Sequence, residues 1–143
     1  MTFHRQIHLR TRTGIAVHDI TAEVRDCVAD SGIGEGILVV TSLHTTLAVT
    51  INEHESRLLD DIRDFFLRLA PPDAPYRHND IHLRDCPPDE PENAHAHLIA
   101  MMLGNSETLA IQRGRPVLGT WQSILAVELD GPRDRSLAVQ VLG

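Results

Sequence analysis

Alternating hydrophobic and polar positions predict β-strands in the first and last thirds of the chain. Phe3–Arg12 alternates with a period of two, which predicts a strand with one face in water. The apolar run Ile37–Val40 leads into Leu47–Ile51, where β-branched residues alternate again. Three further strands are predicted between turn residues, at Glu107–Ile111, Val117–Leu129 and Ser136–Leu142.

Helical periodicity predicts two longer helices. The first follows Asp19 or Thr21, either of which can cap it, and carries its apolar residues at helical spacing. The second covers Glu53–Ala70, where apolar residues repeat every 3.6 positions until Pro71–Pro72 end the helix. Its Phe65–Phe66 pair is expected to lie in the core.

A proline-rich loop and a short helix complete the expected elements. Residues 71–92 contain six of the eight prolines, so the loop is either mobile or functional. Asn93 is a suitable N-cap for a helix over Ala94–Leu103. His95 and His97 lie about 200° apart around that helix, so only one of them can face a given site. Spacing slightly favours His97.

These elements predict an α+β fold. Mixed or antiparallel β-sheets are expected to pack with two longer helices and one short helix, in a single domain spanning residues 1–143. The chain has 143 residues, of which 42% are hydrophobic and 23% charged, enough for one core. There is more predicted β surface than two helices can cover, which favours burial of sheet between subunits.

Charge and composition narrow the classes of partner. The net charge of −7 argues against nucleic acid, which requires a basic face. No signal segment and no membrane-length apolar run occurs, so we expect no membrane partner and a cytoplasmic location. The two cysteines, Cys27 and Cys86, do not form a disulfide framework, and Cys27 is expected in the core.

Nine histidines are a high number for this length. His44 lies between two predicted strands, His78 in the proline-rich loop and His97 on the short helix. Neutral imidazoles that converge from separate elements are typical zinc ligands, with a further position left for water or substrate. The alternative for His44 is a hydrogen-bonded interior histidine, and spacing alone does not decide between the two.

Five blocks along the chain resemble the YjbQ-type family, also described as a secondary thiamine-phosphate synthase family. The blocks are the stretch Thr41–Glu53, Tyr76–His78, Asn93–Leu98 with Leu103–Gly104, Leu118–Gln122 and Asp130–Arg133. The resemblance implies an α+β fold that assembles as a homotrimer and binds a phosphorylated small-molecule substrate. It also implies a divalent metal ion held by His44, His78 and His97.

The reaction that the resemblance implies joins a pyrimidine methyl diphosphate to a thiazole phosphate and releases diphosphate. This transferase would need cations beside the leaving diphosphate and a water-excluding pocket. Arg133 and Arg135 are candidates for the charge, with Arg113 and Arg115 as alternatives, and Trp121 with Gln122 are candidates for substrate binding. The catalytic candidates are Glu53, as a possible base, with Asn52 and Thr45; their alternative roles are structural or at the surface.

The additional histidines and one cysteine leave the ligand set open. His82, His95 and Cys86 lie close in sequence to the predicted ligands, and a sulfur ligand would favour zinc over magnesium. Two other functions remain: metal-assisted hydrolase or lyase chemistry on a phosphorylated small molecule, and a trimeric metal- or ligand-binding protein without turnover.

Overall fold

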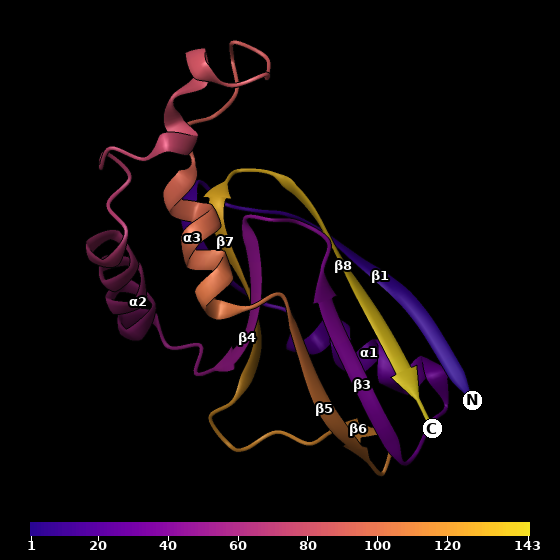
Figure 1. Ribbon diagram of the computed structural model, residues 1–143. Helices are drawn as coiled ribbons and strands as arrows, with labels where there is room; N and C mark the ends of the chain where they lie inside the picture. The colour runs from indigo at the N-terminus through magenta and orange to yellow at the C-terminus, as the bar shows by residue number, and fades with distance from the viewer.

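Two antiparallel β-sheets and three α-helices make up the fold (Figure 1). The computed structural model describes residues 1–143. The strands are β1 (Thr2–Arg10), β2 (Gly14–Asp19), β3 (Gly36–Ser42), β4 (Leu47–Asn52), β5 (Ser106–Gln112), β6 (Arg115–Pro116), β7 (Ser123–Gly131) and β8 (Asp134–Leu142). The helices are α1 (Thr21–Ser31), α2 (Ser56–Leu69) and α3 (Ala94–Leu103), with short 3₁₀ turns η1 (Arg77–Asn79) and η2 (Ile81–Leu83).

The strand order confirms the predicted α+β class. The larger sheet has the order β1-β8-β3-β5-β6 and the smaller one β2-β7-β4, and every pairing is antiparallel. β2 was not predicted, because it has only six residues and begins at Gly14, a residue type that is typical of turns. The predicted strand Val117–Leu129 was too long. Residues 117–122 form an irregular segment with a turn at 120–121, in which the Gly119 amide donates to Gln122 Oε1 at 2.8 Å, and β7 begins at Ser123.

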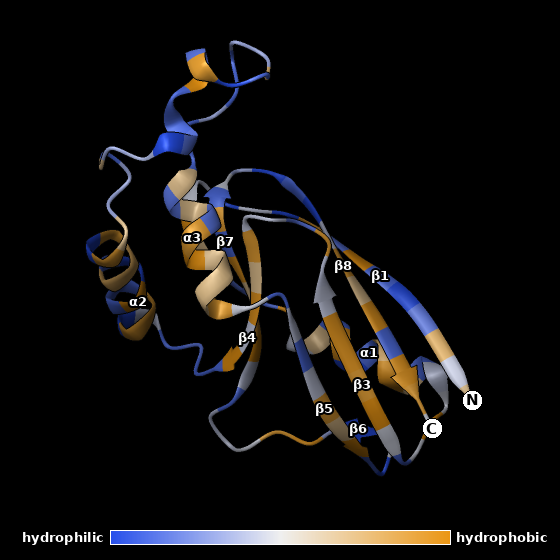
Figure 2. Cartoon of the chain, viewed as in Figure 1, coloured by the Kyte–Doolittle hydropathy of each residue, from blue (hydrophilic) through white to orange (hydrophobic).

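Two hydrophobic clusters lie on opposite faces of the smaller sheet. The first contains the apolar face of α1 and the inner faces of both sheets, and the second lies beneath α2 and α3. In β4, Leu47 and Val49 enter the first cluster and Ala48 the second. Figure 2 shows this strand as largely hydrophobic. β4 is therefore a central, rigid support on which a site can be built.

The long amphipathic helix forms, but it begins at Ser56 and not at Glu53, and Phe66 is its only buried residue. Its Glu55 side chain accepts bonds from the amides of Arg57 and Leu58 and so caps the first turn. The prediction that both phenylalanines lie in the core is wrong, since Phe66 is 8% exposed but Phe65 is 52% exposed. α2 contacts the small sheet through one narrow face, which leaves Phe65 outside. No helix has the length and apolar character that crossing a bilayer requires.

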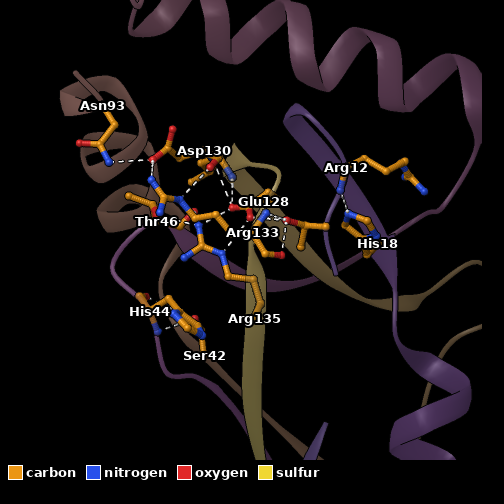
Figure 3. Close-up of polar contacts among 12 residues, drawn as sticks. Arg12, His18, Ser42, His44, Thr46, Asn93, Glu128, Asp130, Arg133 and Arg135 are labelled. Atoms are coloured by element: carbon orange, nitrogen blue, oxygen red, sulfur yellow. Dashed lines mark hydrogen bonds and ion pairs between the residues drawn. The ribbon is translucent and has the colours of Figure 1, made fainter. Parts of the chain in front are cut away.

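A buried ion pair ties several elements together. Arg135 on β8 donates from Nε and Nη2 to the Glu128 carboxylate on β7, at 2.8 and 2.6 Å, and from Nη2 to Thr46 Oγ1 at 2.7 Å (Figure 3). The hydroxyl of Thr11 also donates to Glu128 at 2.5 Å. Glu128 is 0% and Arg135 5% exposed. Each of the two buried charges is therefore neutralised by the other, and removing either side chain would leave a buried charge without a partner.

Glu128→Gln should destabilise the fold strongly, because Arg135 would become a buried cation without a counter-charge. We expect a loss of about 3–5 kcal/mol at neutral pH, measured by urea denaturation. Burial by itself raises the pKa of Glu128, but the hydrogen bonds from Arg135 and Thr11 outweigh it and lower the pKa below its ordinary value of 4.5. The loss should therefore shrink as the pH falls below 4.5 and the wild-type carboxylate takes up a proton.

The matched control is Asp60→Asn, which removes one carboxylate of an exposed ion pair with Arg63. Its expected cost is about 0–1 kcal/mol, because solvent screens the pair. Equal effects of the two substitutions would contradict a stabilising role for the buried pair.

Candidate functional site

His44 is fixed at the connection between β3 and β4. Its Nε2 accepts a hydrogen bond from the backbone amide of Ser136 on β8 at 2.9 Å, and its own amide donates to Ser42 Oγ at 3.2 Å (Figure 3). Because an amide can only donate, Nε2 is the acceptor and the neutral ring carries its proton on Nδ1. Burial, followed by the charge of Arg135, lowers the pKa of His44. His44 therefore offers an N–H donor to the pocket.

His78 and His97 meet across two elements that are far apart in the sequence. Their ring centroids are 4.7 Å apart in an edge-to-face arrangement. Asn79 Oδ1 accepts from the amide of Ala94 at 3.1 Å and so joins η1 to the start of α3. Asn79, and not the predicted Asn93, therefore provides the side-chain cap of this helix. Burial, then the neighbouring His78, lowers the pKa of His97.

Two adjoining cavities share His44, Thr45 and His97 as a common wall. One, of about 430 Å³, is polar and is also lined by Arg133 and Arg135, with Thr46, Glu90 and Asn93. The other, of about 440 Å³, has apolar side chains on its far side: Leu47, Ala100 and Met101. We call the two together the histidine pocket. It places N–H donors and guanidinium groups next to an apolar surface.

The two arginines of the pocket are positioned differently. Arg135 is buried, and its Nε and Nη2 are engaged by Glu128 and Thr46. The Arg133 side chain is 40% exposed; its Nη2 donates to Asp130 Oδ2 at 2.7 Å and its Nε to the Asp130 carbonyl at 3.0 Å. Asn93 Nδ2 also donates to Asp130 Oδ2, at 2.8 Å, so this carboxylate fixes the start of α3. Arg133 is the more accessible cation.

The three predicted ligands do not form a metal site. No group of three or more His, Cys, Asp or Glu side chains is placed to hold a metal ion. The bond from Ser136 occupies the His44 Nε2 lone pair and leaves the proton on Nδ1, so His44 has no free lone pair in the ring plane. The predicted zinc-binding cluster of three histidines is therefore wrong. A divalent ion as cofactor stays a prediction without a ligand set.

The other predicted site residues divide between two ends of β4. Thr45 lies at the histidine pocket, before the strand begins. Asn52, Glu53, Trp121 and Gln122 line a separate recess at the strand's other end. β4 has six residues, so the two ends are roughly 16 Å apart at about 3.3 Å per residue. The predicted catalytic and substrate-binding roles stay predictions, and they do not belong to one pocket within a single chain.

The remaining candidates lie outside the histidine pocket. His82 is exposed on η2, in the loop that projects beyond α3 (Figure 1). The half-buried Cys86 directs Sγ toward the carbonyl of Ile81 at 3.9 Å. His95 is partly buried on α3, its Nδ1 has no hydrogen-bond partner, and burial lowers its pKa. The helical-face argument for His97 over His95 is consistent with this placement.

Sequence reasoning missed the acidic side chains that organise the pocket. Glu128 occurs in an apolar run of β7, and such a lone carboxylate inside a buried strand is a signal for a paired charge. Asp130 and Glu90 have no comparable signal, because turn and loop segments are commonly acidic. The pairing of Glu128 with Arg135 depends on the packing of Thr46 and Thr11, which are distant in sequence.

The largest cavity is elsewhere and offers less chemistry. It measures about 650 Å³ and lies between β2 and α2. Its two arginines are engaged: Arg12 Nη2 donates to the Val17 carbonyl at 2.9 Å, and Arg63 pairs with Asp60 at 3.2 Å. It contains no histidine. The histidine pocket is therefore the better candidate.

The fold and pocket define a class of small α+β proteins with two antiparallel sheets. Residues 5–143 match the family described as UPF0047 protein YjbQ-like, and the chain belongs to this family. A UPF0047 protein of Methanothermobacter thermautotrophicus is 44% identical over 99% of this chain and 92% of its own length. UPF0047 protein YugU of Bacillus subtilis is 31% identical over 97% of this chain and 98% of its own.

Solved structures agree with the family assignment. A YbjQ-like protein of unknown function from Sulfolobus solfataricus matches with a TM-score of 0.90 and 37% identity, over 100% of this chain and 98% of that one. A YjbQ/UPF0047 protein of Clostridium acetobutylicum matches with a TM-score of 0.86 and 34% identity, over 96% and 99%. The predicted family is thus confirmed.

The predicted thiamine-phosphate synthase is wrong. The relatives are described only as UPF0047 proteins or as proteins of unknown function, so they support no transferase activity. The metal-bearing histidine cluster on which that activity rested is absent from the fold. The synthase, the metal-assisted hydrolase or lyase, and metal binding by a trimeric protein are therefore all unsupported.

The His44 ring should be a neutral Nδ1–H tautomer with a pKa below 6.5, because burial and Arg135 disfavour its charged form. Heteronuclear NMR of the ring nitrogens measures the tautomer and the titration in one experiment. Below its pKa the added proton competes with the Ser136 amide, so the amide signal of Ser136 should shift with the same midpoint. A proton on Nε2, or titration at or above 6.5, would contradict this geometry.

Proposed function

We propose that this protein binds a small phosphorylated molecule in the histidine pocket without needing a metal ion. The supporting observation is the pair of adjoining cavities that share His44, Thr45 and His97. A phosphate would lie on the polar side, near Arg133, and the body of the molecule on the apolar side, near Met101. Ligand pockets commonly combine a few placed polar groups with such an apolar wall.

The donor set fits phosphate. A guanidinium forms charge-assisted hydrogen bonds with phosphate oxygens, and Arg133 is partly accessible with no bond from its Nη1. His44 adds a neutral N–H, and Thr45 a hydroxyl. Glu90 also lines the polar cavity, so this cavity combines cations with one carboxylate. That arrangement favours a phosphate ester that also carries a hydrogen-bond donor.

The geometry of Arg133 supports this role over a purely structural one. Asp130 holds Nε and Nη2 and so fixes the plane of the guanidinium, which reduces the entropy lost when a ligand binds. Asp130 is itself held by Asn93, at the start of the helix that carries His97. The cation and the imidazole are thus positioned by one shared carboxylate.

Phenyl phosphate tests the proposal, because its phosphate and ring match the two cavities. After dialysis against a chelator, calorimetric titration should detect phenyl phosphate more strongly than phenol or inorganic phosphate. Arg133→Gln should weaken phenyl phosphate about tenfold, the cost of one charge-assisted hydrogen bond.

The control variant is Arg115→Gln, an exposed arginine on β6 that lines neither cavity. It should bind phenyl phosphate like the wild type. Equal affinity for phenol, or unchanged affinity in the Arg133 variant, would contradict phosphate recognition by this pocket.

We also propose that the chain self-associates as a homotrimer through the outer face of the larger sheet. On that face, away from α1, charged side chains occur only at the margins, as the Arg10–Asp134 ion pair and Arg115. The rest of the face, which we call the uncharged face, is formed by Thr2, His4, Gln6, His8, Ser136, Ala138, Gln140, Leu142, Ile37, Val39, Thr41, Ser106, Thr108 and Ala110. Copies with a net charge of −7 repel one another, so an uncharged face is where they can approach.

A trimer requires two different surfaces that fit each other, because its contacts run head to tail around the ring. The exposed apolar side chains of α3 supply a second surface: Leu98 is 45%, Met101 82% and Met102 69% exposed. Contact at α3 would also cover the apolar side of the histidine pocket, which Met101 lines. This would exclude water from a bound ligand.

Sedimentation at micromolar concentration should give three times the chain mass of 15.9 kDa. Val39→Lys, at the centre of the uncharged face, should shift the protein toward monomer, because burying an unpaired ammonium group is costly. Thr120→Lys, in an exposed turn outside that face, should leave the trimer intact. A monomeric wild type, or a trimeric Val39 variant, would refute this interface.

A further inference from the structure

A second recess lies at the opposite end of β4 from the histidine pocket. It has a volume of about 430 Å³ and is lined by Ile51, Asn52, Glu53, Trp121 and Gln122. Two turns form it: the chain leaving β4 and the segment that enters β7. The register places Asn52 directly opposite Ser123, so the two turns are joined by the strand ladder. In Figure 1 they lie at the end of the molecule away from the projecting loop.

The polar groups of the recess have a defined orientation. Asn52 Oδ1 accepts from the Glu53 amide at 2.8 Å, and Gln122 Oε1 accepts from the Gly119 amide at 2.8 Å. Both amide oxygens are therefore occupied within their own turns, and each leaves an NH₂ group for a ligand. These bonds hold the turns in place before anything binds.

Two groups in the recess have no structural partner. The half-buried Glu53 carboxylate takes part in none of the six ion pairs of the chain and accepts no hydrogen bond from another residue. The Trp121 indole is 74% exposed, although it is the only tryptophan of the chain. A large exposed aromatic side chain beside an uncompensated carboxylate is unusual in a surface turn.

We propose that this recess binds a small organic cation, such as a quaternary ammonium group. The face of an indole attracts cations through its quadrupole, and a carboxylate supplies the opposite charge. Neither group is otherwise satisfied here, and the cation satisfies both. The two NH₂ groups of Asn52 and Gln122 would contact a hydroxyl or carbonyl on the same molecule.

Other classes of ligand fit this recess less well than a cation does. An anion would be repelled by Glu53, and the recess contains no arginine. A purely apolar ligand would gain from Trp121 but leave Glu53 unpaired. The recess is also independent of the histidine pocket, with which it shares no residue. The inference therefore does not rest on the binding of phosphorylated molecules.

Choline and 3,3-dimethylbutan-1-ol form a suitable pair of probes, because they have the same shape and differ only in charge. Trp121 is the sole tryptophan, so its fluorescence reports directly on the recess. Choline should change this fluorescence saturably, and the neutral alcohol should bind about tenfold or more weakly. Equal responses to the two probes, or no saturable response to choline, would overturn the proposal.

Two Glu→Gln variants, one in the recess and one outside it, test whether choline binds at the recess. Glu53→Gln should reduce choline affinity to that of the neutral alcohol, whereas Glu23→Gln, an exposed position on α1, should leave it unchanged. In Trp121→Leu, the linewidth of the choline methyl NMR signal should no longer respond to protein. Arg133→Gln should bind choline like the wild type, which separates this result from the test of the histidine pocket. Unchanged choline binding in the Glu53 variant would refute the role of the carboxylate.

Discussion

The ion pair between Glu128 and Arg135 connects the two sheets at the point where the candidate site lies. Its hydrogen bonds extend to Thr46, which precedes β4, and to Thr11, which follows β1. A buried pair of this kind contributes little net stability compared with apolar residues, but losing one partner is costly. The pair therefore restricts which arrangements of these four segments can exist, and with them the position of the histidine pocket.

The same end of the molecule contains a second set of contacts that fixes the pocket's walls. Asp130 receives bonds from Arg133 and Asn93, and Asn79 caps α3 from the proline-rich loop. Together these bonds bring His78 against His97. The loop therefore has a structural role at its base, next to α3, while the rest of it projects beyond α3 (Figure 1) and exposes Leu83 to solvent. Polar side chains, rather than apolar packing, determine this part of the structure.

β4 separates two sites of different character. At its start, imidazoles and guanidinium groups form a pocket suited to phosphate, and at its end a carboxylate and an indole form a recess suited to a cation. Because both of its faces are buried, the strand fixes the distance between the two sites. The central part of the outer face of the larger sheet has no charged side chain, and it is the surface through which we propose that copies of the chain meet.

The sequence by itself determined most of the elements, because hydrophobic periodicity reports which face of a segment is buried. It also identified the family, from five separate blocks of residues along the chain that resemble it. It did not determine which donors meet: a backbone amide of β8 occupies the His44 ring, and Asn79 replaces Asn93 as the cap of α3. Phe65 lies outside the core for a similar reason, since the docking of α2 depends on the shape of the sheet beneath it. Such pairings join residues far apart in sequence, so only the tertiary structure decided them.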